Sequence, residues 1–443
     1  MIVMKFGGTS VKDATAMRRV LGIVKAQRER TPLVVLSACG GFTDKLLTMA
    51  RCAGTGDTQK MHEMYQIIST HHITLCNELL ANETYRERAL HRTNTLLEEL
   101  RVFCEGIALL GECTPRSLDA IASFGERLST SIFTIAAQEQ GLDALFHDAR
   151  TTMRTDSVYT NATVQFSQLQ TLSRGQILPH MEQGGIVITQ GFIGSTEQRI
   201  TTTLGRGGSD LSAALYGAAL LAEEIQIWTD VSGVLSADPR VIPNAKSLPE
   251  ISYAEVRQLS YYGAKVLHPD TIKPAVDKNI PVKVLNTFEP ANPGTTIVYS
   301  TKPEEHGLRA VTLMQNCMMI RFDASPDESA AHILADVLEY CHVQKVEILA
   351  SVGNESSCAI VIRSSDSTII PNANAVRTAV ALLCACGPNL LQHGTELFEF
   401  ASALQESSPL SVLYGSSDVS IIALLSPDKA QAALQKVHEY IAV

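Results

Sequence analysis

The sequence predicts an α/β protein with a mostly parallel sheet sandwiched by helices, followed by two small α+β units. Short apolar runs alternate with longer segments of helical period as far as residue 285, and this alternation is typical of strand–helix–strand crossovers. Near residues 301–307 the composition changes to a charged, proline-containing linker. Beyond the linker, a strand, helix, strand, strand order occurs and then recurs in part. We therefore expect domains at residues 1–300, 308–385 and 386–443, with strands that the last two can share.

The composition is typical of a soluble globular protein. The chain has 443 residues, of which 45% are hydrophobic and 19% charged, so it is long enough for two or three domains with sizeable cores. Its net charge of −10 argues against a nucleic acid or an anionic membrane as a partner. No apolar run approaches the roughly 18 residues of a membrane-spanning helix, so we expect no membrane segment.

The ten cysteines indicate a reducing compartment. None stands in a CxxC pair and we expect no secretory signal, so free thiols in the cytoplasm are predicted. The pair His71-His72 lies in a helical stretch without a third ligand in pattern, and we interpret it as structural. We therefore assign no residue to a protein-held metal.

The chain begins with an apolar strand at residues 1–6, which runs into the loop Gly7-Gly8-Thr9-Ser10 and a helix from Asp13. In open α/β sheets, ligands bind beyond the carboxyl ends of the strands. Lys5 would then project at the site, and the amides of Gly7 and Gly8 could hold a phosphate. The alternative is that Lys5 is a solvated surface charge.

A second apolar strand, at residues 33–37, is followed by Gly40-Gly41, Thr43 and a helix from Lys45. The order of strand, double glycine and hydroxyl residue is therefore repeated. Because the carboxyl ends of parallel strands meet at one edge of a sheet, this second loop is expected beside the first.

Helical segments dominate the next part of the chain. Residues 57–112 have a helical period with one charged face, and a long helix is expected at residues 117–140. Glu126 interrupts the apolar face of that helix, and from spacing alone we interpret it as a solvated charge. Short strands are expected at residues 145–148 and 186–190.

The stretch Thr201–Asp210 has the strongest chemical signal of any single loop. Its three glycines within four positions let backbone N–H groups turn towards one point, and an apolar helix at residues 211–224 would present its N-terminus there. Arg206 adds a guanidinium suited to a carboxylate or a phosphate. Ser209 and Asp210 are expected to cap the helix and to face the same pocket. The alternative is an ordinary glycine-rich loop with a solvated arginine.

Two common nucleotide-binding motifs are absent from the sequence. Neither GxGxxG nor GxxxxGK[ST] occurs, so we expect neither a dinucleotide fold nor a P-loop fold. The remaining features of this region are a strand at residues 225–230 that ends in Thr229 and Asp230, the tripeptide Asp238-Pro239-Arg240, the stretch Gly263–Pro269 that contains Lys265, and a last strand at residues 280–285.

The C-terminal region reads as two small repeats. The first is expected to contain strands at residues 318–323, 346–351 and 359–363 around a helix at residues 329–341, and the second a helix at residues 395–405 with strands at residues 411–413 and 420–424. Few titratable residues converge in either repeat, so both suit ligand binding or subunit association better than chemistry.

Taken together, the motifs resemble those of the aspartokinases. They are Lys5-Phe-Gly-Gly-Thr-Ser-Val11, Ser37-Ala38 with Gly41 and Thr43, Ser123 with Gly125-Glu126, Thr201–Asp210, Trp228-Thr229-Asp230, and Gly263–Pro269. Each motif alone is weak, but the set covers residues 1–300 in the family's order. The resemblance implies the amino-acid kinase fold for that region and paired ferredoxin-like ACT domains for the C-terminal repeats.

The reaction implied by the resemblance is transfer of the γ-phosphoryl group of ATP to the β-carboxylate of L-aspartate. This is the first step towards lysine, threonine and methionine. A carboxylate with an ordinary pKa of about 3.9 is already ionised at neutral pH, so no general base is required, and catalysis would consist of positioning and charge neutralisation. ATP and Mg²⁺ are the implied cofactors, with Mg²⁺ carried mainly by the ATP phosphates.

The resemblance also implies catalytic roles for individual residues. Lys5 would contact the transferred phosphate beside the amides of Gly7 and Gly8. Asp210 would orient that lysine near the metal. Lys265 would add a second positive charge on the nucleotide side.

Substrate and nucleotide contacts follow in the same way. Arg206 would clamp the α-carboxylate of aspartate, and Glu126 would receive its α-ammonium, in place of the solvated role that spacing favours. The remaining implied contacts are Thr43 and Ser209 for the substrate, and Ser37, Thr229, Asp230, Arg240 and Lys265 for the nucleotide.

Two positions depart from the family's pattern. Leu235 stands where many relatives have an aromatic residue before the Asp-Pro-Arg tripeptide, so a ring contact to the nucleotide is not implied there. Pro326 and two acids lie in a stretch where lysine-binding relatives usually have a glycine. An amino-acid effector at the ACT domains is therefore left open, whereas a homodimer through them is expected.

Two other functions are compatible with the same motifs. One is a kinase of the same fold for another acceptor, such as glutamate, acetylglutamate or a nucleotide, although Arg206 with Glu126 suits a zwitterionic amino acid. The other is a non-catalytic amino-acid sensor, which the presence of Lys5 and Asp210 argues against. We expect no fused homoserine dehydrogenase, given the length and the absent dinucleotide motif.

Overall fold

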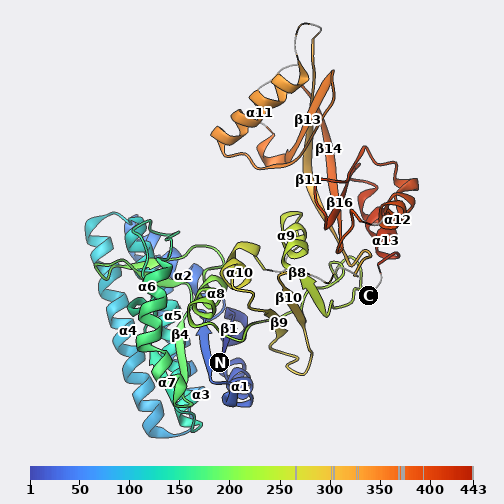
Figure 1. Ribbon diagram of the computed structural model, residues 1–443. Helices are drawn as coiled ribbons and strands as arrows, with labels where there is room; N and C mark the ends of the chain where they lie inside the picture. The colour runs from blue at the N-terminus through green and yellow to red at the C-terminus, as the bar shows by residue number, and fades with distance from the viewer. Residues whose placement is uncertain are drawn as a thin grey trace. The chain divides into compact units, whose positions relative to one another are not determined.

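In the computed structural model, the described residues are 1–264, 267–300, 302, 305–325, 327, 329–367, 370, 375–392 and 394–441. They form two compact units, each of which we describe separately (Figure 1). The first unit contains Met1–Val234 and Leu267–Tyr299, and the second contains Leu235–Val266 and Ser300–Val443. Residues 235–266, which we expected with the first region, thus group with the C-terminal part of the chain.

A parallel sheet forms the centre of the first unit. Its strands lie in the order β3-β4-β2-β1-β7-β9, and β10 pairs with β9 in the antiparallel sense. The predicted mostly parallel sheet is therefore confirmed, although β10 was not expected. The strands are β1 (Ile2–Phe6), β2 (Pro32–Leu36), β3 (Ala144–His147), β4 (Ile186–Gln190), β7 (Glu224–Thr229), β9 (Val282–Asn286) and β10 (Thr295–Val298).

Helices cover this sheet, and the predicted helical region at residues 57–112 is confirmed by α3 and α4. Figure 1 shows α3, α4 and α5 gathered on one side of the unit. The helices are α1 (Ala14–Ala26), α2 (Phe42–Gly54), α3 (Thr58–Leu79), α4 (Glu83–Leu110), α5 (Pro115–Glu139), α6 (Phe166–Gln176), α7 (Leu178–Glu182), α8 (Gly208–Leu220) and α10 (Pro269–Val276).

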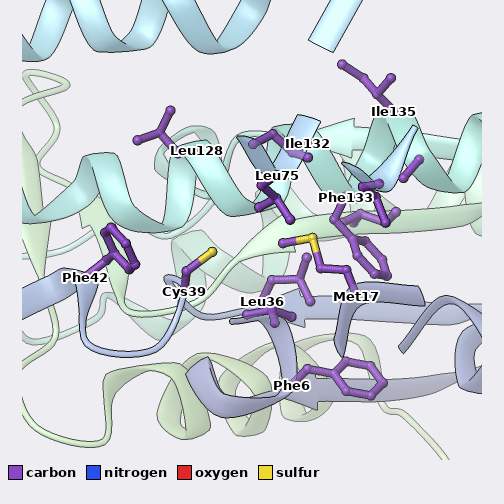
Figure 2. Packing of buried hydrophobic residues seen from close by; sticks show 14 of the residues in the cluster. Phe6, Met17, Leu36, Cys39, Phe42, Leu75, Leu128, Ile132, Phe133 and Ile135 are labelled. Carbon is purple, nitrogen blue, oxygen red and sulfur yellow. The ribbon is translucent and has the colours of Figure 1, made fainter. Parts of the chain in front are cut away.

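The alternation of side chains along β1 determines what packs on each face of the sheet. Ile2, Met4 and Phe6 belong to one apolar core with residues of α1 to α5, part of which Figure 2 shows. Val3 points to the other face, where its Cγ2 would lie 3.8 Å from a Cβ placed on Gly217 of α8. Lys5 shares the face of Val3, so its side chain lies on the side of the sheet that α8 covers.

Two short strands were not predicted from the sequence, β5 (Ile193–Ser195) and β6 (Thr201–Thr203). They form a separate antiparallel hairpin, in which Thr202 lies opposite Gly194. Three residues are too few to give a periodic signal, which explains why the pattern of the sequence did not indicate them. β6 leads directly into the glycine-rich loop and α8.

Helix α8 begins earlier than expected. We predicted a helix at residues 211–224, but it begins at Gly208 and ends at Leu220, because Glu224 already starts β7. Ser209 and Asp210 therefore lie in its first turn, and the prediction that they cap the helix is wrong. The N-cap is Gly207, which has left-handed backbone (φ 72°). Because glycine has no side chain, no side-chain cap forms.

The second unit contains an antiparallel sheet in the order β12-β13-β11-β14-β16-β15. The two β-α-β-β repeats share this sheet through the pairing of β11 with β14, so the predicted paired α+β units are confirmed. The sequence analysis did not predict β14, the first strand of the second repeat, or α13. The elements are β8 (Glu250–Ser252), α9 (Tyr253–Tyr261), β11 (Ala310–Asp323), α11 (Ala330–Gln344), β12 (Ile348–Gly353), β13 (Ser357–Arg363), β14 (Val376–Cys386), α12 (Thr395–Ala403), β15 (Ser411–Leu413), β16 (Ser420–Leu425) and α13 (Ala430–His438).

Residues 235–266 are held in the second unit by backbone and side-chain contacts. The N–H of Val311 donates to the carbonyl of Ser236 at 2.8 Å, and the hydroxyl of Tyr262 donates to the carbonyl of Leu349 at 3.2 Å. Ala237 and Ile242 belong to the apolar core of this unit. These contacts explain why the segment groups with the C-terminal sheet.

Gly125 allows α5 to approach the loop that follows β2, and this generates a stability prediction. A Cβ on Gly125 would lie 2.7 Å from the Cβ of Ala38, which the backbone holds in place. We expect Gly125→Ala to lower the free energy of unfolding by about 1–3 kcal/mol, since overpacking outweighs the gain in helix propensity. Chemical unfolding measures the change.

Gly106→Ala is the matched control, because nothing lies within 4 Å of a Cβ at this exposed position of α4. There alanine should raise the free energy of unfolding by about 0.5–1 kcal/mol. A Gly125→Ala protein as stable as the Gly106→Ala protein would show that α5 does not pack closely on this loop.

Candidate active site

The loops that follow β1, β2 and β6 line one cavity of about 330 Å³ in the first unit. It lies beyond the carboxyl ends of β1 and β2, where open α/β sheets bind their ligands. The cavity brings together most of the residues that the sequence analysis selected. They are Lys5, Gly7, Gly8, Ser37, Thr43, Glu126, Arg206, Ser209 and Asp210.

Lys5 and Asp210 form an ion pair in this cavity. The Lys5 Nζ lies 2.6 Å from the Asp210 Oδ1, and the two side chains are only 11% and 18% exposed. β1 places Lys5 on the face that α8 covers, and Asp210 lies in the first turn of α8, where the helix dipole favours a carboxylate. An ammonium has three donors, so the lysine can bind a ligand oxygen while the pair is kept.

The glycines bring the backbone of these loops close together. A Cβ on Gly8 would lie 3.0 Å from the carbonyl oxygen of Ala38 and 3.2 Å from the Cα of Gly40, so the loops after β1 and β2 touch. Gly205 and Gly207 have left-handed backbone, with φ 76° and 72°. The cavity is thus bordered by the first turn of α8, where N–H groups without intrahelical partners favour an anion.

Glu126 is buried, which corrects the interpretation from spacing that it is a solvated charge. Its side chain comes from α5, next to Gly125, and the residue is 3% exposed. One carboxyl oxygen, Oε1, accepts from the N–H of Ala38 at 3.1 Å, and among the described residues nothing hydrogen-bonds to Oε2. Burial raises the pKa of this carboxyl group to about 8, so without a charged partner the carboxyl group is largely protonated near neutral pH.

Arg206 supplies the second cation of the cavity. It is exposed, and within the described part of the chain its guanidinium makes no hydrogen bond or ion pair. The Lys5 ammonium is neutralised by Asp210 and Glu126 is protonated, so Arg206 leaves the lining with an uncompensated positive charge. The arrangement suits a ligand that carries carboxylate or phosphate groups together with one hydrogen-bond donor for Glu126.

The predicted nucleotide residues have different positions. Thr229 is the last residue of β7 and Asp230 follows it. Strand β7 pairs with β1, and the N–H of Gly7 donates to the carbonyl of Trp228 at 3.2 Å. Thr229 and Asp230 are therefore next to the loop after β1, although they do not line the cavity. Arg240 belongs to the second unit, where it pairs with Asp238. Lys265 and the departure at Pro326 lie outside the described residues.

Phe192 is a lining residue that the sequence analysis did not select. It has left-handed backbone with φ 67°, a conformation that is strained for a bulky residue. Its N–H donates to the Ser212 Oγ at 2.9 Å, and its carbonyl accepts from the N–H of Leu204 at 2.9 Å. The available signal was its place two residues after the end of β4, at the edge where the other loops meet.

Cys39 also lines the cavity. Burial raises the pKa of its thiol to about 12, so the thiol is neutral there. All ten cysteines are free thiols. Within the part of the chain that the structure describes, no group of three or more His, Cys, Asp and Glu side chains could hold a metal ion, and no helix is both long and apolar enough to span a membrane.

The fold and the cavity define a class of protein. A parallel α/β unit gathers glycine loops, a lysine–aspartate pair, an arginine and a buried glutamate at the ends of its strands. A family model described as the amino acid kinase family matches residues 1–286, which is more than half of the chain.

Comparison with individual proteins narrows the class. The chain is 33% identical over 455 residues to the lysine-sensitive aspartokinase 3 of Escherichia coli (strain K12), which covers 99% of this chain and 98% of that protein. The crystal structure of E. coli aspartokinase III with aspartate and ADP matches 99% of both chains with a TM-score of 0.80 and 32% identity. The structure of that enzyme with lysine and aspartate matches 100% of both chains with a TM-score of 0.84 and 32% identity. The chain therefore belongs to the aspartokinases of the amino acid kinase family.

Glu126 makes stability depend on pH in a direction that can be measured. Its pKa is raised from 4.5 to about 8 in the folded protein, so between these values the folded state keeps a proton that the unfolded chain loses. Stability is therefore lost as the pH rises through this window. Glu126→Gln removes the titration, and we expect it to raise the melting temperature by a margin that grows from about pH 5 to about pH 8.5.

Thermal melts of both proteins without substrate measure this margin at each pH. Every other titrating group contributes equally to both proteins, so the difference isolates Glu126. A margin that stays constant with pH would show that the carboxyl group is ionised in the folded state throughout.

Proposed function

We propose that this protein is an ATP-dependent aspartate kinase, which transfers the γ-phosphoryl group of ATP to the β-carboxylate of L-aspartate. The observation that carries the proposal is the shared cavity of the Lys5–Asp210 pair, Arg206 and the buried Glu126. The membership of the chain in the aspartokinases supports it, as does the binding of aspartate and ADP by E. coli aspartokinase III.

Aspartate recognition is assigned to two groups of opposite character. The Arg206 guanidinium clamps the α-carboxylate with its fork of N–H groups. The free Oε2 of Glu126 receives the α-ammonium, and the approaching positive charge lowers the pKa of the carboxyl group. Binding near neutral pH is then accompanied by release of a proton from Glu126. Thr43 and Ser209, which line the same cavity, supply further polar contacts.

Phosphoryl transfer needs positioning and charge neutralisation rather than a base. The β-carboxylate of aspartate is ionised and attacks the γ-phosphorus directly, while the bond from that phosphorus to the bridging oxygen breaks and ADP leaves with the electron pair. Lys5 contacts the transferred group, and Asp210 holds the lysine in place through the 2.6 Å contact. The amides of Gly7 and Gly8, together with the first turn of α8, add fixed dipoles that stabilise negative charge in a preorganised site.

The nucleotide is assigned to Ser37, Thr229 and Asp230 of the first unit, and to Arg240 and Lys265. Mg²⁺, carried mainly by the ATP phosphates, would further neutralise the charge of the transferred group. Carboxylate oxygens suit this ion. Asp210 is the acid of the cavity lining that fits, beside the Lys5 that it orients.

The C-terminal repeats are assigned to association and regulation. We place a homodimer contact and an amino-acid effector site in residues 308–385 and 386–443, beyond a catalytic region at residues 1–300. The shared sheet of the two repeats supports this assignment, as does the crystal structure of E. coli aspartokinase III with lysine. The free cysteines are typical of the cytoplasm, where we place the enzyme.

Trapping of the acyl phosphate with hydroxylamine tests the reaction. The purified protein receives ATP and Mg²⁺ with aspartate, glutamate or acetylglutamate, in parallel samples with lysine or threonine. We expect hydroxamate with aspartate alone, and Lys5→Ala should lower kcat roughly 10²–10³-fold because a preorganised cation at the transferred group is lost. Lys25→Ala, at an exposed position of α1, is the matched control and should turn over normally.

Three results would contradict parts of the proposal. Hydroxamate with glutamate in place of aspartate would indicate a different acceptor. A wild-type protein that is inactive with every acceptor would favour the amino-acid sensor, and normal turnover by a folded Lys5→Ala protein would refute the role of the lysine.

Arg206→Ala separates binding from chemistry. Its contact with the α-carboxylate exists in both the ground state and the transition state, so we expect KM for aspartate to rise about tenfold or more with little change in kcat. Steady-state kinetics at saturating ATP measure both constants. Arg174→Ala, at an exposed position of α6, is the control. An unchanged KM in the Arg206→Ala protein would show that Arg206 does not bind the α-carboxylate.

A further inference from the structure

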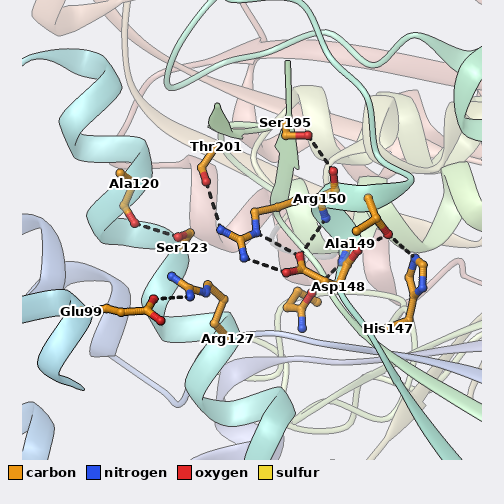
Figure 3. Close-up of polar contacts among 12 residues, drawn as sticks. Glu99, Ala120, Ser123, Arg127, His147, Asp148, Ala149, Arg150, Ser195 and Thr201 are labelled. Carbon is orange, nitrogen blue, oxygen red and sulfur yellow. Dashed lines mark hydrogen bonds and ion pairs between the residues drawn. The ribbon is translucent and has the colours of Figure 1, made fainter. Parts of the chain in front are cut away.

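The side chain of each of the three threonines of β6 makes a hydrogen bond to a residue outside the hairpin. Thr201 Oγ1 accepts from the Arg150 guanidinium at 3.4 Å, as Figure 3 shows. Thr202 Oγ1 lies 2.7 Å from Thr155 Oγ1, and Thr203 Oγ1 donates to Asp119 at 2.6 Å. A strand of three residues has few ladder bonds of its own. These side-chain bonds therefore fix β6, which leads into the loop that carries Arg206.

Asp119 makes the most contacts in this set. It is 1% exposed, and besides the Thr203 hydroxyl it accepts from the N–H of Thr203 at 3.0 Å and from the N–H of Thr160 at 2.9 Å. All three groups donate to the Asp119 carboxyl oxygens, and such bonds favour the ionised form of the carboxyl group. Burial raises the pKa of Asp119 above its ordinary value, and these bonds oppose part of the rise.

The Thr160 N–H, which donates to Asp119, belongs to a strained segment that packs on the loop carrying Arg206. Thr160 is β-branched and has left-handed backbone with φ 71°, a conformation that persists only where the surroundings impose it. The N–H of Ala162 donates to the carbonyl of Thr203 at 2.9 Å. A Cβ on Gly205 would lie 2.5 Å from Asn161 Oδ1. Residues 160–162 therefore pack against the glycine loop, and Asp119 links this segment to β6.

Asp119 and Glu126 lie on the same helix, about two turns apart on α5. We propose that Asp119 is a positioning residue that fixes the Arg206 loop relative to Glu126, and so sets the spacing of the two groups that receive the α-carboxylate and the α-ammonium. This inference rests on the proposed function. One rigid helix then presents the ammonium-binding carboxyl group at one point and anchors the strand that leads to the carboxylate-binding arginine at another.

Asp119→Asn is the direct test, because its amide keeps the shape but turns one acceptor into a donor that faces an N–H or hydroxyl group. We expect KM for aspartate to rise roughly tenfold to a hundredfold, as for the loss of hydrogen bonds to a charged group, while KM for ATP changes by less than about twofold. Hydrogen–deuterium exchange should quicken in the peptide that covers residues 201–210.

Two further variants make the test specific. Asp156→Asn is the matched control, because Asp156 accepts from the N–H groups of Val158 and Thr163, both 3.1 Å away, in the same loop as Thr160. It should leave both KM values and the exchange of residues 201–210 unchanged. Thr203→Val removes only the hydroxyl donor, so its KM for aspartate should rise about threefold to tenfold. If Asp119→Asn does not fold, this variant alone tests whether Asp119 positions the Arg206 loop.

The outcomes are distinguishable from failure of the proposed function. A wild-type protein that does not phosphorylate aspartate refutes that function. The exchange measurement would still test whether Asp119 positions the Arg206 loop. Unchanged exchange and unchanged KM in a folded Asp119→Asn protein overturn the inference. An equal rise of both KM values, with faster exchange across the whole first unit, overturns it as well, because Asp119 would then act only on general stability.

Discussion

The ion pair between Lys5 and Asp210 is the interaction on which the rest of the site depends. A lysine at the end of a central strand is costly to bury unless its charge is compensated. Asp210 compensates it from the first turn of α8, where the helix dipole also favours the carboxylate. Because the pair joins β1 to α8, the glycine loops after the first strand and before the helix must meet in one place.

Helix α5 carries two acidic residues whose environments give them different chemistry. Asp119 is surrounded by three donors, whereas Glu126 has one donor on one oxygen and none, among the described residues, on the other. Desolvation acts on both, and the number of donors determines how far it is opposed. Asp119 is accordingly a fixed anchor, and Glu126 is a group whose charge responds to what enters the cavity.

Much of this arrangement could be predicted from local patterns. The apolar runs predicted the parallel strands of the first unit and their positions along the chain, and the positions of Lys5 and Arg206 at loop edges pointed to the cavity. Burial of Glu126 could not be predicted from spacing, because it depends on the close approach of Gly125 to Ala38, a contact between distant segments. The left-handed backbone of Phe192 likewise has no signal in a residue type that rarely adopts it. The strand β14 is rich in alanine and leucine, so its pattern alone does not distinguish a strand from a helix.

Each unit is built from two separate stretches of the chain, and this affects how the chain folds during its synthesis. Residues 235–266 leave the ribosome before β9, which pairs with β7, and well before the sheet on which they pack. Ala237 and Ile242 share an apolar core with residues as late as Val437. That core begins to form only when Leu308 and Val311 are synthesised, and it stays incomplete until α13 is made, which favours aggregation of the nascent chain. Premature termination near the C-terminus would therefore also leave exposed a segment made some two hundred residues earlier, as expected when domains fold as units during synthesis.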